Sequence, residues 1–213
     1  MQLQINETSK KKVKPDLITI HITINKYNID YASLIEESTS TFNLLKEELF
    51  KIKIKKNSIK SENISIRPKF ESNNGYDIDK SKIKGYELNH QVNVSIKNDN
   101  KLLFDIFNIL TNLNISSFYI SYSLKDDSKY KNECLNDVIN QCKKKAIDIA
   151  NNMNMKVEDI ISLDVLDNFV SYLNVDSSQA RVLMCSLDNN SNTDYNFKEI
   201  EVSSSVQMKF LLK

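Results

Sequence analysis

The chain has 213 residues, of which 40% are hydrophobic and 27% are charged, and its formal net charge is +1. This composition is typical of a globular protein that buries one or two cores, and it excludes wholesale disorder. A net charge near zero excludes the overall basic character of nucleic-acid-binding proteins. The short lysine clusters at 10–12, 51–56 and 143–145 are interpreted as solvated surface.

The first residues, MQLQINETSKKK, lack the apolar stretch of an export signal. No uninterrupted apolar run in the chain approaches the length of a membrane span. As written, the sequence therefore predicts a soluble, cytoplasmic protein with no membrane span and with a flexible N-terminus at residues 1–12.

The first half of the chain predicts one strand, one helix and a hairpin. Residues 17–24 alternate apolar and polar side chains, which indicates a strand with one buried face. Asp30 is placed to cap a helix over residues 31–52, whose apolar positions recur at steps of four and three. Two strands at 64–70 and 85–97 follow, and they are expected to pair as a hairpin.

The second half begins with a short helix at 101–112 that is apolar on nearly every side. A strand at 115–124, a long amphipathic helix at 128–153 and strands at 160–166 and 200–212 complete the pattern. The order is βαββ followed by αβαββ. It predicts an α+β fold in which antiparallel sheets pack against two long amphipathic helices and one short apolar helix.

These elements predict a single domain over residues 13–212. A division into two sub-lobes, 13–97 and 98–212, is left open because each half contains one long amphipathic helix. The segment from Asn168 to Lys198 loses its apolar periodicity, so we expect a loop that is the least ordered part of the chain.

Glycine and cysteine usage exclude several classes of site. The chain has two glycines, Gly75 and Gly85, whereas nucleotide-binding loops need clustered glycines so that backbone amides can approach phosphate. Cys134, Cys142 and Cys185 lack metal-ligand spacing and are interpreted as free, dispensable thiols in a reducing compartment.

No residue of the sequence is a candidate for catalysis. His21 and His90 lie within predicted strands and are interpreted as strand-face histidines, and the acidic pairs at 36–37, 47–48 and 126–127 as helix-surface charges. One loop has the ligand spacing of an EF-hand, without its glycine, and we expect it not to bind calcium: Asp188, Asn190, Asn192, Asp194 and Glu199. The sequence predicts a protein that is not an enzyme and has no metal or cofactor.

With these elements in place, the sequence resembles the SIMPL-domain family from about Val13 to Leu211. The segment Ile83-Lys84-Gly85-Tyr86-Glu87-Leu88 and the later Lys145-Ala146 of the long helix are its most specific motifs. Further matches are Pro15-Asp16, Ile64-Ser65-Ile66-Arg67-Pro68, Asn114-Ile115 and the alternating strand from Ile200 to Leu212.

The resemblance implies a family without established catalytic residues. Relatives are often periplasmic or envelope proteins linked to stress defence, and some form ring-like homo-oligomers. The family commonly has glycines where this chain has Leu113 and the segment from Met153 to Val157, which predicts turns of a different shape here.

The leading interpretation is a non-enzymatic binding or scaffold protein that forms a homo-oligomer and has a link to envelope or stress physiology. The short apolar helix carries the predicted assembly contact, at Phe104, Ile109 and Leu102, because its apolar surface exceeds what one sheet contact buries. A monomeric adaptor that binds another protein is the alternative, and an enzyme of unknown type is a weaker one.

Overall fold

The computed structural model describes residues 1–73, 77–171, 173–176 and 199–213. It confirms the predicted α+β class, with two antiparallel sheets in this part of the chain. The strands are β1 (Gln2–Val13), β2 (Leu17–Asn28), β3 (Ile59–Asn73), β4 (Asp77–Lys97), β5 (Ser117–Ser123), β6 (Val157–Val170), β7 (Leu173–Asp176) and β8 (Ile200–Leu212). The helices are α1 (Tyr31–Lys51), α2 (Asn100–Asn112) and α3 (Ser128–Asn152), and a short 3-10 turn, η1 (Lys56–Ser58), precedes β3.

The chain folds into two compact units that interleave along the sequence. The first unit comprises Met1–Pro15, Ser123–Leu173 and Asn196–Lys213, and the second comprises Asp16–Tyr122 and Asn174–Tyr195. This division differs from the suggested sub-lobes 13–97 and 98–212. The reason is that β5 lies beside β2 in one sheet, so that α2 and β5 belong with the earlier elements.

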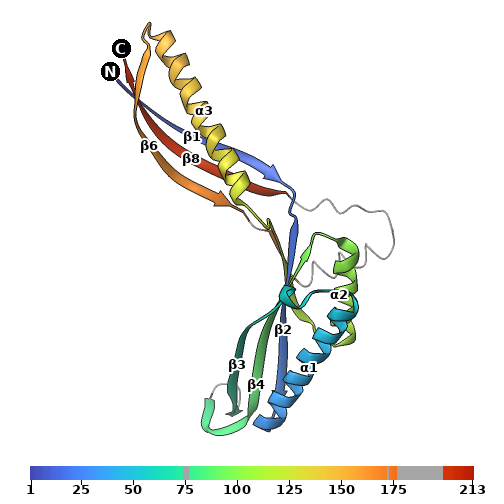
Figure 1. The fold of residues 1–213 in the computed structure, drawn as a ribbon. Helices are drawn as coiled ribbons and strands as arrows, with labels where there is room; N and C mark the ends of the chain where they lie inside the picture. The colour runs from blue at the N-terminus through green and yellow to red at the C-terminus, as the bar shows by residue number, and fades with distance from the viewer. Residues whose placement is uncertain (74–76, 172, 177–198) are drawn as a thin grey trace. The chain divides into compact units, whose positions relative to one another are not determined.

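In the first unit, one long helix covers part of a three-stranded sheet with the order β1-β8-β6. β8 lies in the middle, pairs antiparallel with both neighbours, and buries every second side chain. α3 runs along the sheet and packs mainly against β8 and β1, and less against β6 (Figure 1). The core between them contains Ile5, Val138, Cys142, Ala146, Ala150, Val206, Met208, Phe210 and Leu212.

In the second unit, the strand order is β3-β4-β2-β5-β7. The chain order β2-α1-β3-β4-α2-β5 builds the split β-α-β arrangement, in which β4 lies between β2 and β3. Asp30 caps α1 by accepting the Ser33 amide at 2.7 Å, as the sequence predicted. α1 packs against β2 and β4, and its Leu34, Leu45 and Leu49 are fully buried.

Each of α1, α2 and α3 is followed, two residues after its end, by a residue with a left-handed backbone: Lys53, Asn114 and Asn154, with φ of 65°, 55° and 55°. The next amide then donates to a carbonyl five residues earlier at 2.8–3.1 Å: Ile54 to Leu49, Ile115 to Leu110, and Met155 to Ala150. The two departures from the family pattern, at Leu113 and at the segment from Met153 to Val157, fall in two of these turns, where the left-handed residue is an asparagine. Asparagine tolerates this conformation better than other non-glycine residues, so these turns keep an ordinary helix-ending geometry.

Gly85 in β4 is required by a close approach of β2. A Cβ atom at this position would lie 2.8 Å from the carbonyl oxygen of Asn28 and 2.7 Å from the hydroxyl of Tyr27. The Tyr27 hydroxyl also donates to the carbonyl of Lys84 at 3.1 Å. Any side chain at Gly85 would therefore push the two strands apart, which gives a packing reason for the glycine of this motif.

The N-terminus and the long loop differ from the sequence predictions. Residues 1–12 are not a flexible tail, because β1 pairs with β8 along its whole length, from Gln2 opposite Leu211 to Val13 opposite Ile200. The predicted loop at 168–198 begins later than expected, since β6 continues to Val170 and β7 follows it. Residues 177–198 lie outside the described residues.

Candidate protein-binding surface

The two histidines are held by neighbouring side chains on opposite faces of the second unit's sheet. The ring of His21 stacks on Tyr119 with centroids 4.3 Å apart, and its nitrogens lie 2.9 Å from Asn93 Oδ1 and 2.8 Å from Ser121 Oγ. His90 is buried and its Nε2 lies 2.7 Å from Ser61 Oγ. Burial lowers the pKa of His90, which favours the neutral ring.

Two of the three cysteines are buried thiols in the core of the first unit. Burial raises the pKa of both Cys134 and Cys142, which disfavours the reactive thiolate. The Cys134 thiol lies 3.5 Å from the carbonyl oxygen of Val202, to which it donates a weak hydrogen bond. Cys185 lies outside the described residues.

The EF-hand-like spacing falls almost entirely outside the described residues, which include only Glu199 of its five positions. Within the described ranges, no group of three or more His, Cys, Asp or Glu side chains is placed to hold a metal ion. The prediction that the chain binds no metal stays a prediction.

The short helix α2 buries most of its apolar surface inside the chain. Leu103, Ile106, Phe107 and Leu110 are almost inaccessible, and Ile109 keeps 8% of its surface exposed. Leu102 and Phe104 are half-buried. The structure therefore leaves Ile109 little surface for an outside contact, and the assembly role of Leu102 and Phe104 stays a prediction.

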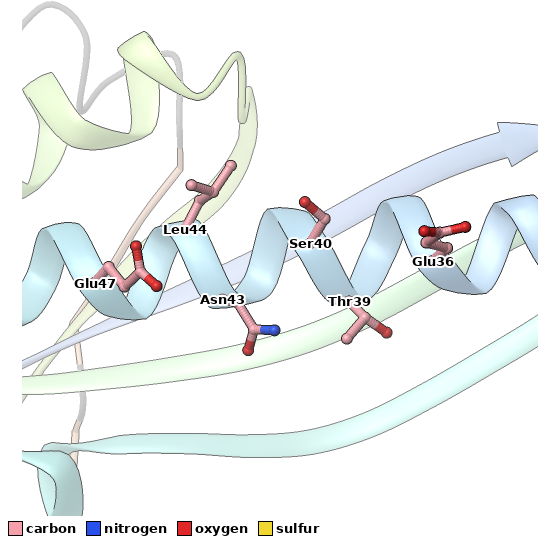
Figure 2. A pocket seen from close by; sticks show the side chains of 6 residues that line it. All are labelled: Glu36, Thr39, Ser40, Asn43, Leu44 and Glu47. Atoms are coloured by element: carbon pink, nitrogen blue, oxygen red, sulfur yellow. The ribbon is translucent and has the colours of Figure 1, made fainter.

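A shallow hollow lies on the outer side of α1. Figure 2 shows the side chains that line it, all of which project from this single helix: Glu36, Thr39, Ser40, Asn43, Leu44 and Glu47. A hollow lined by one helix encloses little of a ligand, whereas ligand sites usually bury most of the molecule they bind. Glu36 and Glu47 are exposed there, as expected for helix-surface charges.

The strand β6, at the edge of the first unit's sheet, exposes more large hydrophobic side chains than any other described element. Among the described residues it pairs with β8 alone, although it is fourteen residues long. Its exposed large hydrophobic side chains have 40–55% of their surface accessible: Ile160, Ile161, Leu163, Val165, Leu166 and Phe169. A long, apolar, unpaired strand edge offers backbone amides and carbonyls to a further strand, and proteins usually avoid exposing one.

The position of α3 explains why this strand is uncovered. Ile160, Leu163 and Val165 lie opposite Phe210, Met208 and Val206 of β8, whose side chains are buried against the helix. They therefore face the same side of the sheet as α3, but α3 packs over β8 and β1 instead. A groove of about 520 Å³ remains between α3 and β6, lined by Lys143, Ile147, Ala150, Asn151, Lys156, Val157, Ile160 and Phe210.

The exposed edge is also acidic. Glu158, Asp159, Asp164 and Asp167 are exposed, and β6 contains no Lys or Arg. Three register shifts relative to β8 interrupt the strand, so apolar side chains emerge on both faces. The arrangement provides main-chain hydrogen-bonding groups, apolar contacts and negative charge along one line, which is the chemistry of strand addition.

The comparison with protein families covers almost the whole chain. Residues 3–210 match the family described as SIMPL, protein of unknown function (DUF541). The chain belongs to the SIMPL family. No curated protein matches the sequence. In the described part of this SIMPL chain, no helix combines the length and apolar character needed to cross a membrane.

Sequence reasoning expected a strand near 160–166 but not that its apolar side chains would be exposed. The available signal was the segment IISLDVL, in which apolar residues occupy both alternating positions instead of one. Such a pattern is typical of a strand covered on both faces. In this SIMPL chain it marks an edge that its own helix does not cover.

Proposed function

We propose that this SIMPL chain is a non-enzymatic binding or scaffold protein that assembles with copies of itself, and that β6 is its contact element. The observation that supports the proposal is the apolar edge of β6, with Leu166 and Phe169 more than half exposed. Pairing this edge with a further strand would satisfy its main-chain groups and bury its side chains.

The non-enzymatic part is supported by the candidate acids, bases and nucleophiles. His21 is held by Asn93 and Ser121, and His90 by Ser61, so neither is placed beside a carboxylate or a thiol by these contacts. The thiols of Cys134 and Cys142 are buried in the first unit's core. A link to envelope or stress physiology, which the family resemblance implies, stays a prediction.

A monomeric adaptor is the second candidate, and the groove between α3 and β6 favours it. The groove is lined by apolar side chains, among them Ile147 and Ile160, and by Lys143 and Lys156. An adaptor would use this surface for a different protein and would not associate with itself. The two functions therefore share one surface and differ in the mass of the protein in solution.

Light scattering over a range of protein concentrations tests the proposal. The wild type is expected to show a mass above that of the monomer, and Leu163→Asp is expected to shift it toward the monomer. Leu163 is 40% exposed, so the substitution should leave the fold intact, which circular dichroism checks. Ile64→Asp on β3 is the matched control, because Ile64 is also exposed on an edge strand.

A strict monomer at the highest concentration would contradict self-assembly and favour the adaptor. Phe104→Asp belongs in the same series because the sequence predicts that it lowers the assembled fraction. If Phe104→Asp disrupts assembly and Leu163→Asp does not, the contact is at α2 and the assignment to β6 is wrong.

A further inference from the structure

The charge of β6 argues against pairing with the same strand of another copy. Its ionisable side chains are all acidic: Glu158, Asp159, Asp164 and Asp167. Two such strands side by side would place carboxylates against carboxylates, and like charges opposite each other destabilise a strand pair. A strand that adds to this edge should therefore be basic.

The other edge of the same sheet has the complementary charge. β1 pairs with β8 alone among the described residues, and its C-terminal half contains Lys10, Lys11 and Lys12. Lys10 pairs with Glu201 at 2.9 Å and Lys11 with Glu133, yet the side chains keep 62% and 43% of their surface exposed. Lys10, on the face away from α3, therefore remains accessible to carboxylates of a neighbouring chain, whereas Lys11 lies on the α3 face.

The apolar side chains of the two edges lie at matching levels of the sheet. Phe210 of β8 lies between Leu3 of β1 and Ile160 of β6, and Met208 lies between Ile5 and Leu163 in the same way. These four edge residues therefore face the α3 side. When β1 of a second copy lies level with β6, Leu3 adjoins Ile160 and Ile5 adjoins Leu163 on the α3 side. A shift of β1 by two residues keeps its apolar side chains on that same side.

The outer face of the sheet carries charges of opposite sign at its two edges. Lys10 lies opposite Ser203 of β8, whose side chain is on the face away from the helix. Asp164 and Asp167 lie opposite Gln207 and Ser205, which point to that same outer face. At the level alignment Lys10 adjoins Phe169. A shift of β1 by two residues places Lys10 beside Asp167 and Ile5 beside Ile160, so a charge contact and an apolar contact form together.

From this complementarity we infer that β6 of one copy pairs with β1 of the next, so that the three-stranded sheets join edge to edge. The inference rests on the proposed self-assembly and names its two contact strands. Because the β6 edge and the β1 edge are different surfaces, each added copy leaves one β6 edge and one β1 edge of the assembly unpaired. Assembly therefore continues beyond a dimer and weakens as salt concentration rises.

A charge exchange between the two edges tests this pairing. The first variant is Asp164→Lys with Asp167→Lys, and the second is Lys10→Glu with Lys12→Glu. Each variant alone presents like charges on both edges, so its association is expected to weaken about tenfold. An equimolar mixture is expected to restore assembly, because the two lysines introduced on β6 of the first variant can meet the two glutamates introduced on β1 of the second.

The mass of each sample, measured by analytical ultracentrifugation, separates the outcomes, and thermal unfolding confirms that each variant is folded. Lys12→Glu alone is added because it leaves the Lys10–Glu201 ion pair in place. Assembly that survives the β1 substitutions, or a mixture that stays dissociated, overturns the pairing while self-assembly stands. A wild-type protein that is monomeric overturns self-assembly as well.

Discussion

Both units pack one long helix against two strands of a sheet and leave the neighbouring strand at the sheet's edge, but the two edge strands differ in their side chains. In the first unit, α3 covers β8 and β1 and leaves β6 at the edge, and in the second, α1 covers β2 and β4 and leaves β3 at the edge. Each edge strand borders a groove beside the helix. The groove is about 520 Å³ at β6 and about 270 Å³ at β3.

The difference lies in the side chains of the two edges. β3 contains Pro68, which lacks a backbone amide donor, and the basic residues Lys60, Arg67 and Lys69, all common means of protecting an edge. Among the described residues of β3, Ile64 is the exposed large hydrophobic side chain, whereas β6 exposes six such side chains. Under the proposed function, the chemistry of the edge strand, and not the shared plan, distinguishes the binding edge β6 from the protected edge β3.

The largest expected effect is the difference in stability lost when a phenylalanine is truncated on the covered strand β8 or on the uncovered strand β6. Phe210 on β8 is 1% exposed and Phe169 on β6 is 53% exposed. Phe210→Ala is expected to cost about 3–5 kcal/mol of stability, and Phe169→Ala about 0.5 kcal/mol or less, in dilute protein. Urea unfolding followed by circular dichroism measures both. Equal costs would mean that β6 is covered.

A smaller effect concerns the groove of the second unit, where His90 is buried beside Ser61. Burial lowers the pKa of His90 in the folded chain, so the unfolded chain binds the proton more readily. Stability is therefore full above about pH 6.5 and falls as the pH drops below it, by up to about 1.4 kcal/mol per pH unit. Urea midpoints at pH 7.5 and pH 5.5 should differ less in His90→Gln than in the wild type, and an identical pH dependence would refute the assignment.

The smallest effect compares the ends of α1 and α3. Lys53 ends α1 with a left-handed backbone, which costs a non-glycine residue about 1–2 kcal/mol, more than the entropy cost of glycine. Lys53→Gly is therefore expected to raise stability by about 0.5–1 kcal/mol, and Asn154→Gly at the end of α3 by less, since asparagine already tolerates this backbone. Thermal unfolding of the two variants decides this, and a destabilising Lys53→Gly would be inconsistent with a strained turn.

Local sequence patterns predicted the elements whose burial is regular. The alternation in β2 and β8 corresponds to the buried faces of the structure. The four-three spacing predicted the helices, but it placed Tyr31 and Ile35 of α1 inward, where the structure exposes both and buries Leu34. β1 was missed because Glu7 and Lys11 occupy positions of its inward face, where they pair with Lys145 and Glu133 on α3. Charge pairing on that face removes the apolar alternation by which strands are recognised.

The interleaving of the units and the exposure of β6 could not be predicted from local patterns. β1 and β8 pair across almost the whole chain length, from Gln2 to Leu211, and no spacing within one segment reveals such a partner. The exposure of β6 depends on where α3 lies over the sheet. The candidate contact predicted at Phe104, Ile109 and Leu102 relied on the composition of α2 alone, and α2 buries Ile109.

Hydrogen exchange measured in dilute and in concentrated protein tests most directly whether β6 and not β3 is the binding edge. We expect the amides of residues 158–169 in β6 and of residues 2–13 in β1 to exchange more slowly when the protein is concentrated, because strand pairing would protect them. The amides of residues 59–70 in β3 should not change. Protection that appears in β3 while β6 stays unchanged would contradict the assignment of the binding edge.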